Sequence, residues 1–198
     1  MQWPPLPMLV YALALIASRF AFRHREHMAV SEGDSAGRSG RPGPWRGALL
    51  CLLPMAIMQL GPFIEFMLRA AGLLQPFIGK PRAFPPTITT GLLVFAAGTA
   101  LSAMAARQLR DAWGRDPSRL CTSGLYSVLR HPMYAGYLIQ GVGCALMLGA
   151  VWSWGLYGLA VPLIFVRIVV EDRELAGTFP ATFPAYRERV KRLVPFIF

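Results

Sequence analysis

Long stretches without a charged side chain restrict what this sequence can fold into. Residues 87–106 contain no Asp, Glu, Lys or Arg, and neither do residues 132–151. Helical segments of about 20 apolar residues match the thickness of the hydrocarbon core of a bilayer. Hydrophobic residues make up 55% of the chain and charged residues 15%, which is well below the charged share of a typical soluble domain. The sequence therefore predicts an all-α, polytopic integral membrane protein in contact with the lipid bilayer.

The apolar runs predict about five transmembrane helices, followed by a C-terminal cytoplasmic amphipathic helix around residues 181–192. The positive charge at Arg23 follows the first apolar run and does not precede it, which is atypical of a signal peptide. Residues 28–46 are rich in Gly, Ser and Pro and are predicted to form a flexible loop. The predicted transmembrane helices span residues 3–22, 47–68, 87–106, 132–151 and 153–170. Residues 1–198 are thus expected to form a single membrane domain.

Lys and Arg are distributed unevenly along this predicted topology. The segments assigned to the cytoplasm, residues 19–46, 107–130 and 167–192, carry 6, 5 and 6 of them, against 3 in the outer segment 69–82. Cytoplasmic loops of membrane proteins carry an excess of Lys and Arg. We therefore expect a compact multi-pass protein of a bacterial inner membrane, with its N-terminus outside and its C-terminus in the cytoplasm.

The net charge of +10 does not indicate nucleic-acid binding, because the basic residues flank apolar runs and form no basic recognition motif. Such charges set topology and contact anionic lipid headgroups. Cys51, Cys121 and Cys144 are widely separated and have no Cys-x-x-Cys or Cys/His ligand spacing, so we interpret them as reduced residues that fill apolar space. Neither a nucleic-acid partner nor a metal site is expected.

The sequence Arg130-His131-Pro132 has the features of an anion site. Proline is favoured as the first residue of a helix, because its missing N–H would have no partner there. An apolar helix is therefore predicted to begin at Pro132. The free N–H groups and the positive dipole end of such a helix favour a carboxylate or a phosphate.

Two further groups of residues accompany this motif. Gly136, Gln140 and Gly143 are spaced four and three apart, so they share one face of the predicted helix. Bare backbone on this face would let a ligand approach closely, or it would let a neighbouring helix pack tightly. Glu171 and Asp172 follow one membrane crossing later, and the predicted topology puts them at the same cytoplasmic end as the helix start.

These motifs resemble those of the isoprenylcysteine carboxyl methyltransferases and their relatives, the phospholipid N-methyltransferases. Asp172 stands where the second glutamate of that family's acidic pair usually is, and it keeps the charge. The resemblance implies a membrane methyltransferase that uses S-adenosylmethionine and releases S-adenosylhomocysteine, with N-terminal helices and a loop in residues 1–119 and a catalytic core in residues 120–198. The resemblance is carried by Thr122-Ser123-Gly124-x-Tyr126, Arg130-His131-Pro132-x-Tyr134-x-Gly136, Gly141-x-Gly143, Glu171-Asp172-x-x-Leu175, Phe179, Phe183, Tyr186, Val190 and Pro195.

The resemblance and the charges together imply roles for these residues. Arg130, His131 and the helix N-terminus would hold the carboxylate of S-adenosylmethionine, and Glu171 would accept from its ammonium or from a ribose hydroxyl. Arg167 is the candidate contact for an acidic methyl acceptor, because charges at such depth in a membrane are usually functional or paired. The catalytic candidates are thus Arg167 and Glu171. The expected cofactor site consists of Arg130, His131, Tyr134, Gly136, Gln140, Gly141, Gly143, Glu171, Asp172 and Tyr186.

Several alternatives stay open. Glu171 could pair with Arg167 on its own helix, and Tyr186 could pack the tail instead of covering the adenine of the cofactor. The chain could also be an NADPH-dependent membrane reductase of the sterol type, or a non-catalytic membrane scaffold or transporter. The methyltransferase interpretation is preferred, because the motifs occur in order along one span. Its acceptor would be a lipophilic molecule that enters from the membrane: a carboxylate such as isoprenylcysteine, or a lipid phenol, amine or thiol.

Overall fold

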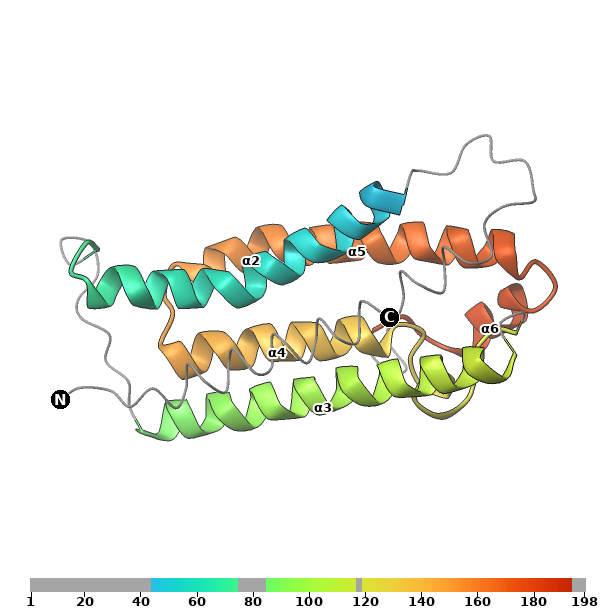
Figure 1. The fold of residues 1–198 in the computed structure, drawn as a ribbon, viewed down its shortest axis with the longest axis horizontal. Helices are drawn as coiled ribbons and strands as arrows, with labels where there is room; N and C mark the ends of the chain where they lie inside the picture. Colours follow the sequence, from blue (N-terminus) through green and yellow to red (C-terminus); the bar gives the residue numbers. More distant parts are fainter. Residues whose placement is uncertain (1–43, 75–84, 117–118, 194–198) are drawn as a thin grey trace. The chain divides into compact units, whose positions relative to one another are not determined.

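The computed structural model describes residues 44–74, 85–116 and 119–193. These residues lie in one compact unit, Pro42–Phe198. The predicted helix at residues 3–22 and most of the predicted loop at 28–46 lie outside the described residues. Within the described ranges the chain is helical and has no strand beyond one isolated bridge, which confirms the all-α prediction for this part. The elements are α2 (Pro44–Ala70), α3 (Pro85–Arg115), η1 (Gly124–Ser127), α4 (Pro132–Leu148), α5 (Ser153–Thr178) and α6 (Phe183–Arg189) (Figure 1).

Helix α4 begins at Pro132, as the sequence predicts, with His131 as its N-cap residue. It ends at Leu148, earlier than the predicted residue 151, because Gly149 adopts the left-handed conformation with φ 60° that commonly terminates helices. Helix α5 begins at Ser153, also as predicted, but continues to Thr178 and so carries the acidic pair within the helix. The acidic pair is therefore held on a regular helical frame.

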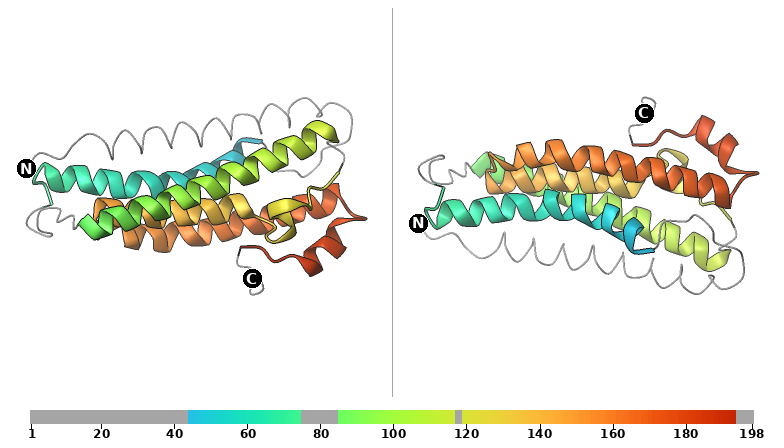
Figure 2. Two further views of the ribbon diagram at one scale, coloured as in Figure 1. Left: turned by 90° about the horizontal axis from the view of Figure 1, so that it is seen from below. Right: turned by 90° about the horizontal axis from the view of Figure 1, so that it is seen from above.

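The C-terminal helix α6 is shorter than the amphipathic helix expected at 181–192. Val190 adopts an extended conformation with φ −112° and ψ 131°, so the helix stops at Arg189. Figure 2 shows α6 folded back beside the end of α5. The chain after α6 then pairs with the segment before α4 through an isolated bridge between Leu129 and Lys191.

Two described helices are long and apolar enough to cross a membrane, Thr87–Arg115 and Ser153–Thr178, whereas α4 is apolar but has only 17 residues. Helix α2 contains Pro54 and Pro62. The apolar helices point to an integral membrane protein, and the five-span topology stays a prediction.

Helix α4 lies between α3 and α2, and α2 lies beside α5 (Figure 1). The contact between α3 and α4 depends on glycines that face each other. A Cβ atom at Gly98 would lie 2.6 Å from the carbonyl oxygen of Gly136, and one at Gly143 would lie 2.8 Å from that of Gly91. Small residues of this kind let helix backbones approach closely in membranes. The glycine face of α4 is therefore occupied by α3.

At the opposite end of α4, Glu65 joins α2 to the turn between α4 and α5. Its Oε1 accepts from the Val151 N–H at 2.6 Å, and its Oε2 accepts from the Ser153 N–H at 2.8 Å and the Ser153 hydroxyl at 2.7 Å. A carboxylate at this position caps the first turn of α5 and interacts favourably with the helix dipole. Arg69 lies 3.7 Å from Glu65 and donates to the Gly149 carbonyl at 2.6 Å. Glu65 and Arg69 therefore form a buried ion pair that stabilises the packing of α2 against the turn between α4 and α5.

The substitution Gly98→Ala is expected to destabilise the protein. The new methyl group would meet the backbone of α4, which can move away only by separating the two helices, so we expect a cost of about 1–3 kcal/mol. The measurement is Tm by circular dichroism of the detergent-purified protein. Gly155→Ala on α5 is the control, because a Cβ there would have no atom within 4 Å. Equal Tm values for the two variants would contradict the close approach of α3 and α4.

Candidate functional site

The chain just before α4 pairs with the segment that follows α6. The Arg130 N–H donates to the Lys191 carbonyl at 2.7 Å, and the His131 N–H donates to the Arg192 carbonyl at 3.0 Å. The Arg130 Nε donates to the Val190 carbonyl at 2.9 Å. Backbone and side-chain hydrogen bonds therefore hold Arg130 and His131, the two residues before Pro132, in place. The end of the described chain is thus part of the same structural unit as the start of α4.

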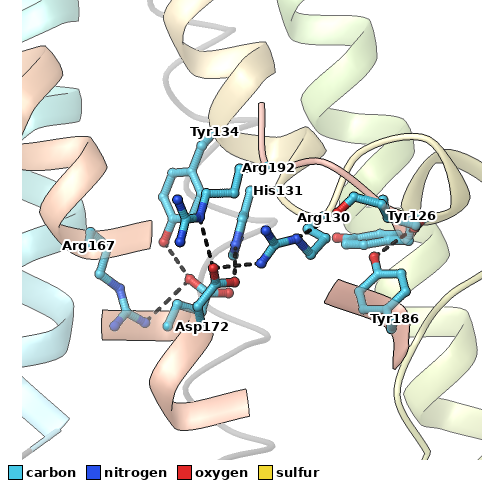
Figure 3. A network of polar contacts seen from close by, with 10 residues as sticks. Tyr126, Arg130, His131, Tyr134, Arg167, Asp172, Tyr186 and Arg192 are labelled. Carbon is cyan, nitrogen blue, oxygen red and sulfur yellow. Dashed lines mark hydrogen bonds and ion pairs between the residues drawn. The ribbon is translucent and has the colours of Figure 1, made fainter. Parts of the chain in front are cut away.

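Three basic side chains converge on the buried carboxylate of Asp172 (Figure 3). Its Oδ1 lies 2.9 Å from the His131 Nε2. Its Oδ2 accepts from the Arg130 Nη1 at 2.6 Å and from the Arg192 Nε at 3.0 Å. A hydrogen bond to an ionised group is stronger than one between neutral groups. Each of these contacts also joins different segments of the chain. Asp172 therefore connects α5, the start of α4 and the C-terminal segment.

The neighbouring acid, Glu171, has a separate set of partners. The Tyr134 hydroxyl donates to the Glu171 Oε2 at 2.8 Å, and the Arg167 Nη2 lies 3.5 Å from the same oxygen. The Arg167 Nη1 also lies 3.2 Å from the Glu174 Oε2. The ion pair that was the structural alternative for Glu171 is thus present, and Tyr134 of α4 adds a second contact. Both acids face the first turn of α4 or the residues just before it.

The start of α4 adds backbone donors to this cluster. His131 caps no N–H with its side chain, and Pro132 occupies the first helical turn. The first N–H groups of an α-helix have no acceptor within the helix, and the positive end of the helix dipole lies there. Cationic side chains and helix-terminal donors therefore occur together at this end of the molecule.

The three glycines expected to expose backbone to the cofactor lie in helix contacts. Gly136 and Gly143 face α3, as described above. A Cβ at Gly141 would lie 3.2 Å from the Cβ of Met58 on α2 and 3.6 Å from the ring of Tyr157 on α5. Neighbouring helices cover all three positions, which favours the packing interpretation, and a role of these glycines at the cofactor stays a prediction.

Gln140 also lies away from the acidic pair, inside the helix bundle. Its Nε2 donates to the Thr99 hydroxyl at 2.9 Å, and its Oε1 accepts from the Gln59 Nε2 at 3.0 Å. These hydrogen bonds link α4 to α3 and α2 within an apolar environment, where buried polar groups need partners. Gln140 thus connects three helices in this structure, and its expected place in the cofactor site stays a prediction.

Tyr186 belongs to the core of the C-terminal segment. It packs with Phe183 and Val190, and only 3% of its surface is exposed. Its hydroxyl donates to the Tyr126 carbonyl at 2.7 Å (Figure 3). Burial raises the pKa of the Tyr186 phenol, so the hydroxyl remains a neutral donor. Of the two interpretations open for Tyr186, the structure favours packing over contact with a cofactor.

The described cysteines, Cys121 and Cys144, are buried and form no disulfide. Burial raises the pKa of the Cys121 thiol, which keeps it protonated and unreactive. In the part of the chain that the structure describes, no group of three or more His, Cys, Asp or Glu residues is arranged to hold a metal ion.

Sequence reasoning did not single out Arg192. It follows the motif residues Tyr186 and Val190, but in the sequence it resembles the other basic residues of the tail. Only the pairing of residues 190–192 with the start of α4 brings its side chain to Asp172.

Comparison with known proteins shows which family this region resembles. Residues 86–182 match the family model described as phospholipid methyltransferase. This region of the chain is therefore similar to that family. It contains both Arg130-His131-Pro132 and Glu171-Asp172, so the motifs that meet in the structure lie within the matched methyltransferase segment. No solved structure matches the chain significantly.

Several curated relatives are named as methyltransferases, which confirms the resemblance seen in the sequence. Protein-S-isoprenylcysteine O-methyltransferase of Schizosaccharomyces pombe is 34% identical over 79 residues, which is 39% of this chain and 34% of that protein. Protein-S-isoprenylcysteine O-methyltransferase B of Arabidopsis thaliana is 36% identical over 80 residues, 40% of this chain and 41% of that protein. Methanethiol S-methyltransferase 1 of Bradyrhizobium diazoefficiens is 30% identical over 80 residues, 40% and 27% of the two chains. The aligned part covers less than half of each relative.

Replacing Asp172 by Ala is expected to lower stability by about 3–5 kcal/mol, because it leaves Arg130 buried without its counter-charge. The decrease in Tm of the detergent-purified protein measures the effect. Glu174→Ala is the matched control on the same helix, since the Glu174 side chain is 46% exposed and such ion pairs contribute about 0–1 kcal/mol. A Tm of Asp172→Ala close to that of the control would show that Asp172 does not hold the site together.

Proposed function

We propose that this protein is an S-adenosylmethionine-dependent membrane methyltransferase that acts on a lipophilic acceptor. The observation that carries the proposal is the meeting of Arg130, His131 and Tyr134 with Glu171 and Asp172 inside the segment that matches the methyltransferase family. Two of the relatives are named for different acceptors, isoprenylcysteine and methanethiol, and both names include methyl transfer.

The side chains of the cluster suit the two charged groups of the methionine moiety of the cofactor. Arg130, His131 and the N-terminus of α4 supply donors for a carboxylate. Glu171 supplies an acceptor for the ammonium or a ribose hydroxyl. The Tyr134 hydroxyl holds the Glu171 carboxylate in place by a hydrogen bond of 2.8 Å. A place for Gly136, Gln140, Gly141, Gly143 and Tyr186 in this site stays a prediction, because other helices or the tail occupy their surroundings.

When bound, S-adenosylmethionine would supply an electrophilic methyl group on a sulfonium. The residues of the chain would bind and orient it so that acceptor atom, methyl carbon and sulfur are in line, and such positioning accounts for several kcal/mol of a barrier. No side chain needs to form a covalent bond with the methyl group. An apolar surrounding that excludes water would favour a charge-neutralising attack by a carboxylate or thiolate acceptor.

Arg167 and Glu171 are the proposed catalytic residues, with Glu171 at the cofactor and Arg167 at the methyl acceptor. Arg167 lies one turn before Glu171 on α5, is only 9% exposed and pairs with Glu171. A buried cation there would orient an acidic acceptor such as an isoprenylcysteine carboxylate; a lipid phenol, amine or thiol is the other acceptor class. We further propose that the acceptor enters from the bilayer and the cofactor from the cytoplasm, with the C-terminus cytoplasmic and the N-terminus outside, in a bacterial inner membrane.

The decisive experiment is a calorimetric titration of the detergent-purified full chain with S-adenosylhomocysteine and, separately, with NADPH. Micromolar binding of S-adenosylhomocysteine alone is expected. Glu171→Gln should weaken that binding more than about tenfold, because the amide cannot replace a charged acceptor.

Glu188→Gln is the control for this titration, because it removes the same charge from an exposed position of α6 and leaves Glu171 intact. Unchanged affinity in Glu171→Gln would remove Glu171 from the site. Binding of NADPH alone would replace the methyltransferase proposal by a membrane reductase, and binding of neither ligand would favour a scaffold or transporter.

A further inference from the structure

Arg192 brings a second guanidinium to the carboxylate that holds Arg130. Its Nε donates to the Asp172 Oδ2 at 3.0 Å, and the Arg130 Nη1 donates to the same oxygen at 2.6 Å. The Arg130 side chain is 6% exposed, whereas that of Arg192 is 24% exposed. Arg192 is therefore the more accessible of the two guanidinium groups to a ligand.

Asp172 itself is poorly placed to bind a ligand. Both of its oxygens already accept hydrogen bonds, from His131, Arg130 and Arg192, and its side chain is 7% exposed. A ligand ammonium would have to displace one of these donors. The role that this geometry supports for Asp172 is to position the basic side chains around it.

The two adjacent acids divide the cluster into halves of opposite charge. Around Asp172 there are two arginines and one acid, so these three groups together carry one positive formal charge. Around Arg167 there are two acids, Glu171 and Glu174, and one arginine, which leaves one negative charge. Because complementary charges favour binding and fix orientation, such a site suits a zwitterion whose carboxylate and ammonium are bonded to the same carbon atom.

We propose that Arg192 is a second cation of the cofactor site. Together with Arg130 it binds the carboxylate of the methionine moiety of the methyl donor, and Asp172 is a positioning residue that orients both guanidinium groups. This inference rests on the proposed function and deepens it. It makes the C-terminal segment part of the binding site for the methyl donor.

The test compares two ligands that differ in the zwitterion. S-adenosylhomocysteine carries the amino-acid moiety, and 5′-methylthioadenosine has the same adenosine and thioether without it. In calorimetric titrations of the full chain, Arg192→Gln is expected to weaken S-adenosylhomocysteine binding by about tenfold or more, as for loss of a charge-assisted hydrogen bond. Affinity for 5′-methylthioadenosine should stay the same, and Arg192→Lys should recover part of the lost affinity for S-adenosylhomocysteine.

Arg189→Gln is the matched control, because it removes the same charge from the end of α6, three residues before Arg192. Arg189 is exposed, and its Nε donates to the Ala185 carbonyl of its own helix. This variant should bind both ligands like the unmodified protein.

The outcomes separate this inference from the function on which it rests. If the unmodified protein binds S-adenosylhomocysteine and Arg192→Gln binds it equally well, only the inference falls. A parallel loss of both ligands in Arg192→Gln would show that Arg192 merely supports the fold, and it would also overturn the inference. If the unmodified protein binds neither ligand, the proposed function fails and the inference with it. Should Arg192→Gln not fold, the charge-preserving Arg192→Lys decides by the same two-ligand comparison.

Discussion

The buried carboxylate of Asp172 is the interaction on which the site depends. It joins three parts of the chain that are far apart in sequence: α5, the residues before α4 and the segment after α6. Arg130 is buried with it, and a buried guanidinium without a counter-charge is strongly unfavourable. Asp172 is therefore a condition for the basic side chains to gather at this end of the bundle, whatever ligand they bind.

Side-chain contacts hold helices α4 and α5 in place at both ends. These contacts keep the residues of the site in fixed positions relative to one another. At one end Asp172 and Glu171 connect α5 to Arg130, His131 and Tyr134. At the other end Glu65 holds the turn between the two helices. Between these ends, the paired glycines let α3 lie directly against α4. The first turn of α4 is thus presented to α5 by a packed frame, as a preorganised binding site requires.

The division of the acidic pair connects this frame to the proposed chemistry. Successive residues of a helix point in directions about 100° apart, so Glu171 and Asp172 meet different partners although they are neighbours. Asp172 holds the basic side chains in place, whereas Glu171 contacts Tyr134 and Arg167. A zwitterionic methyl donor with its two charges would match both halves, and the family match of residues 86–182 makes a methyl donor the reasonable ligand.

The sequence alone determined the local features: where α4 and α5 begin, the apolar character of the helices, and the motif that carries the family resemblance. These follow from short-range rules such as proline at a helix start, and from the lack of charge over long runs. Sequence could not decide which neighbour covers each helix face, so Gly136, Gln140 and Tyr186 were expected at a cofactor but pack against protein. Arg192 was overlooked for the same reason, since it reaches Asp172 only through the pairing of residues 190–192 with the start of α4. Which surface stays open to a ligand is a property of tertiary packing, because it depends on contacts between residues that are distant in the chain.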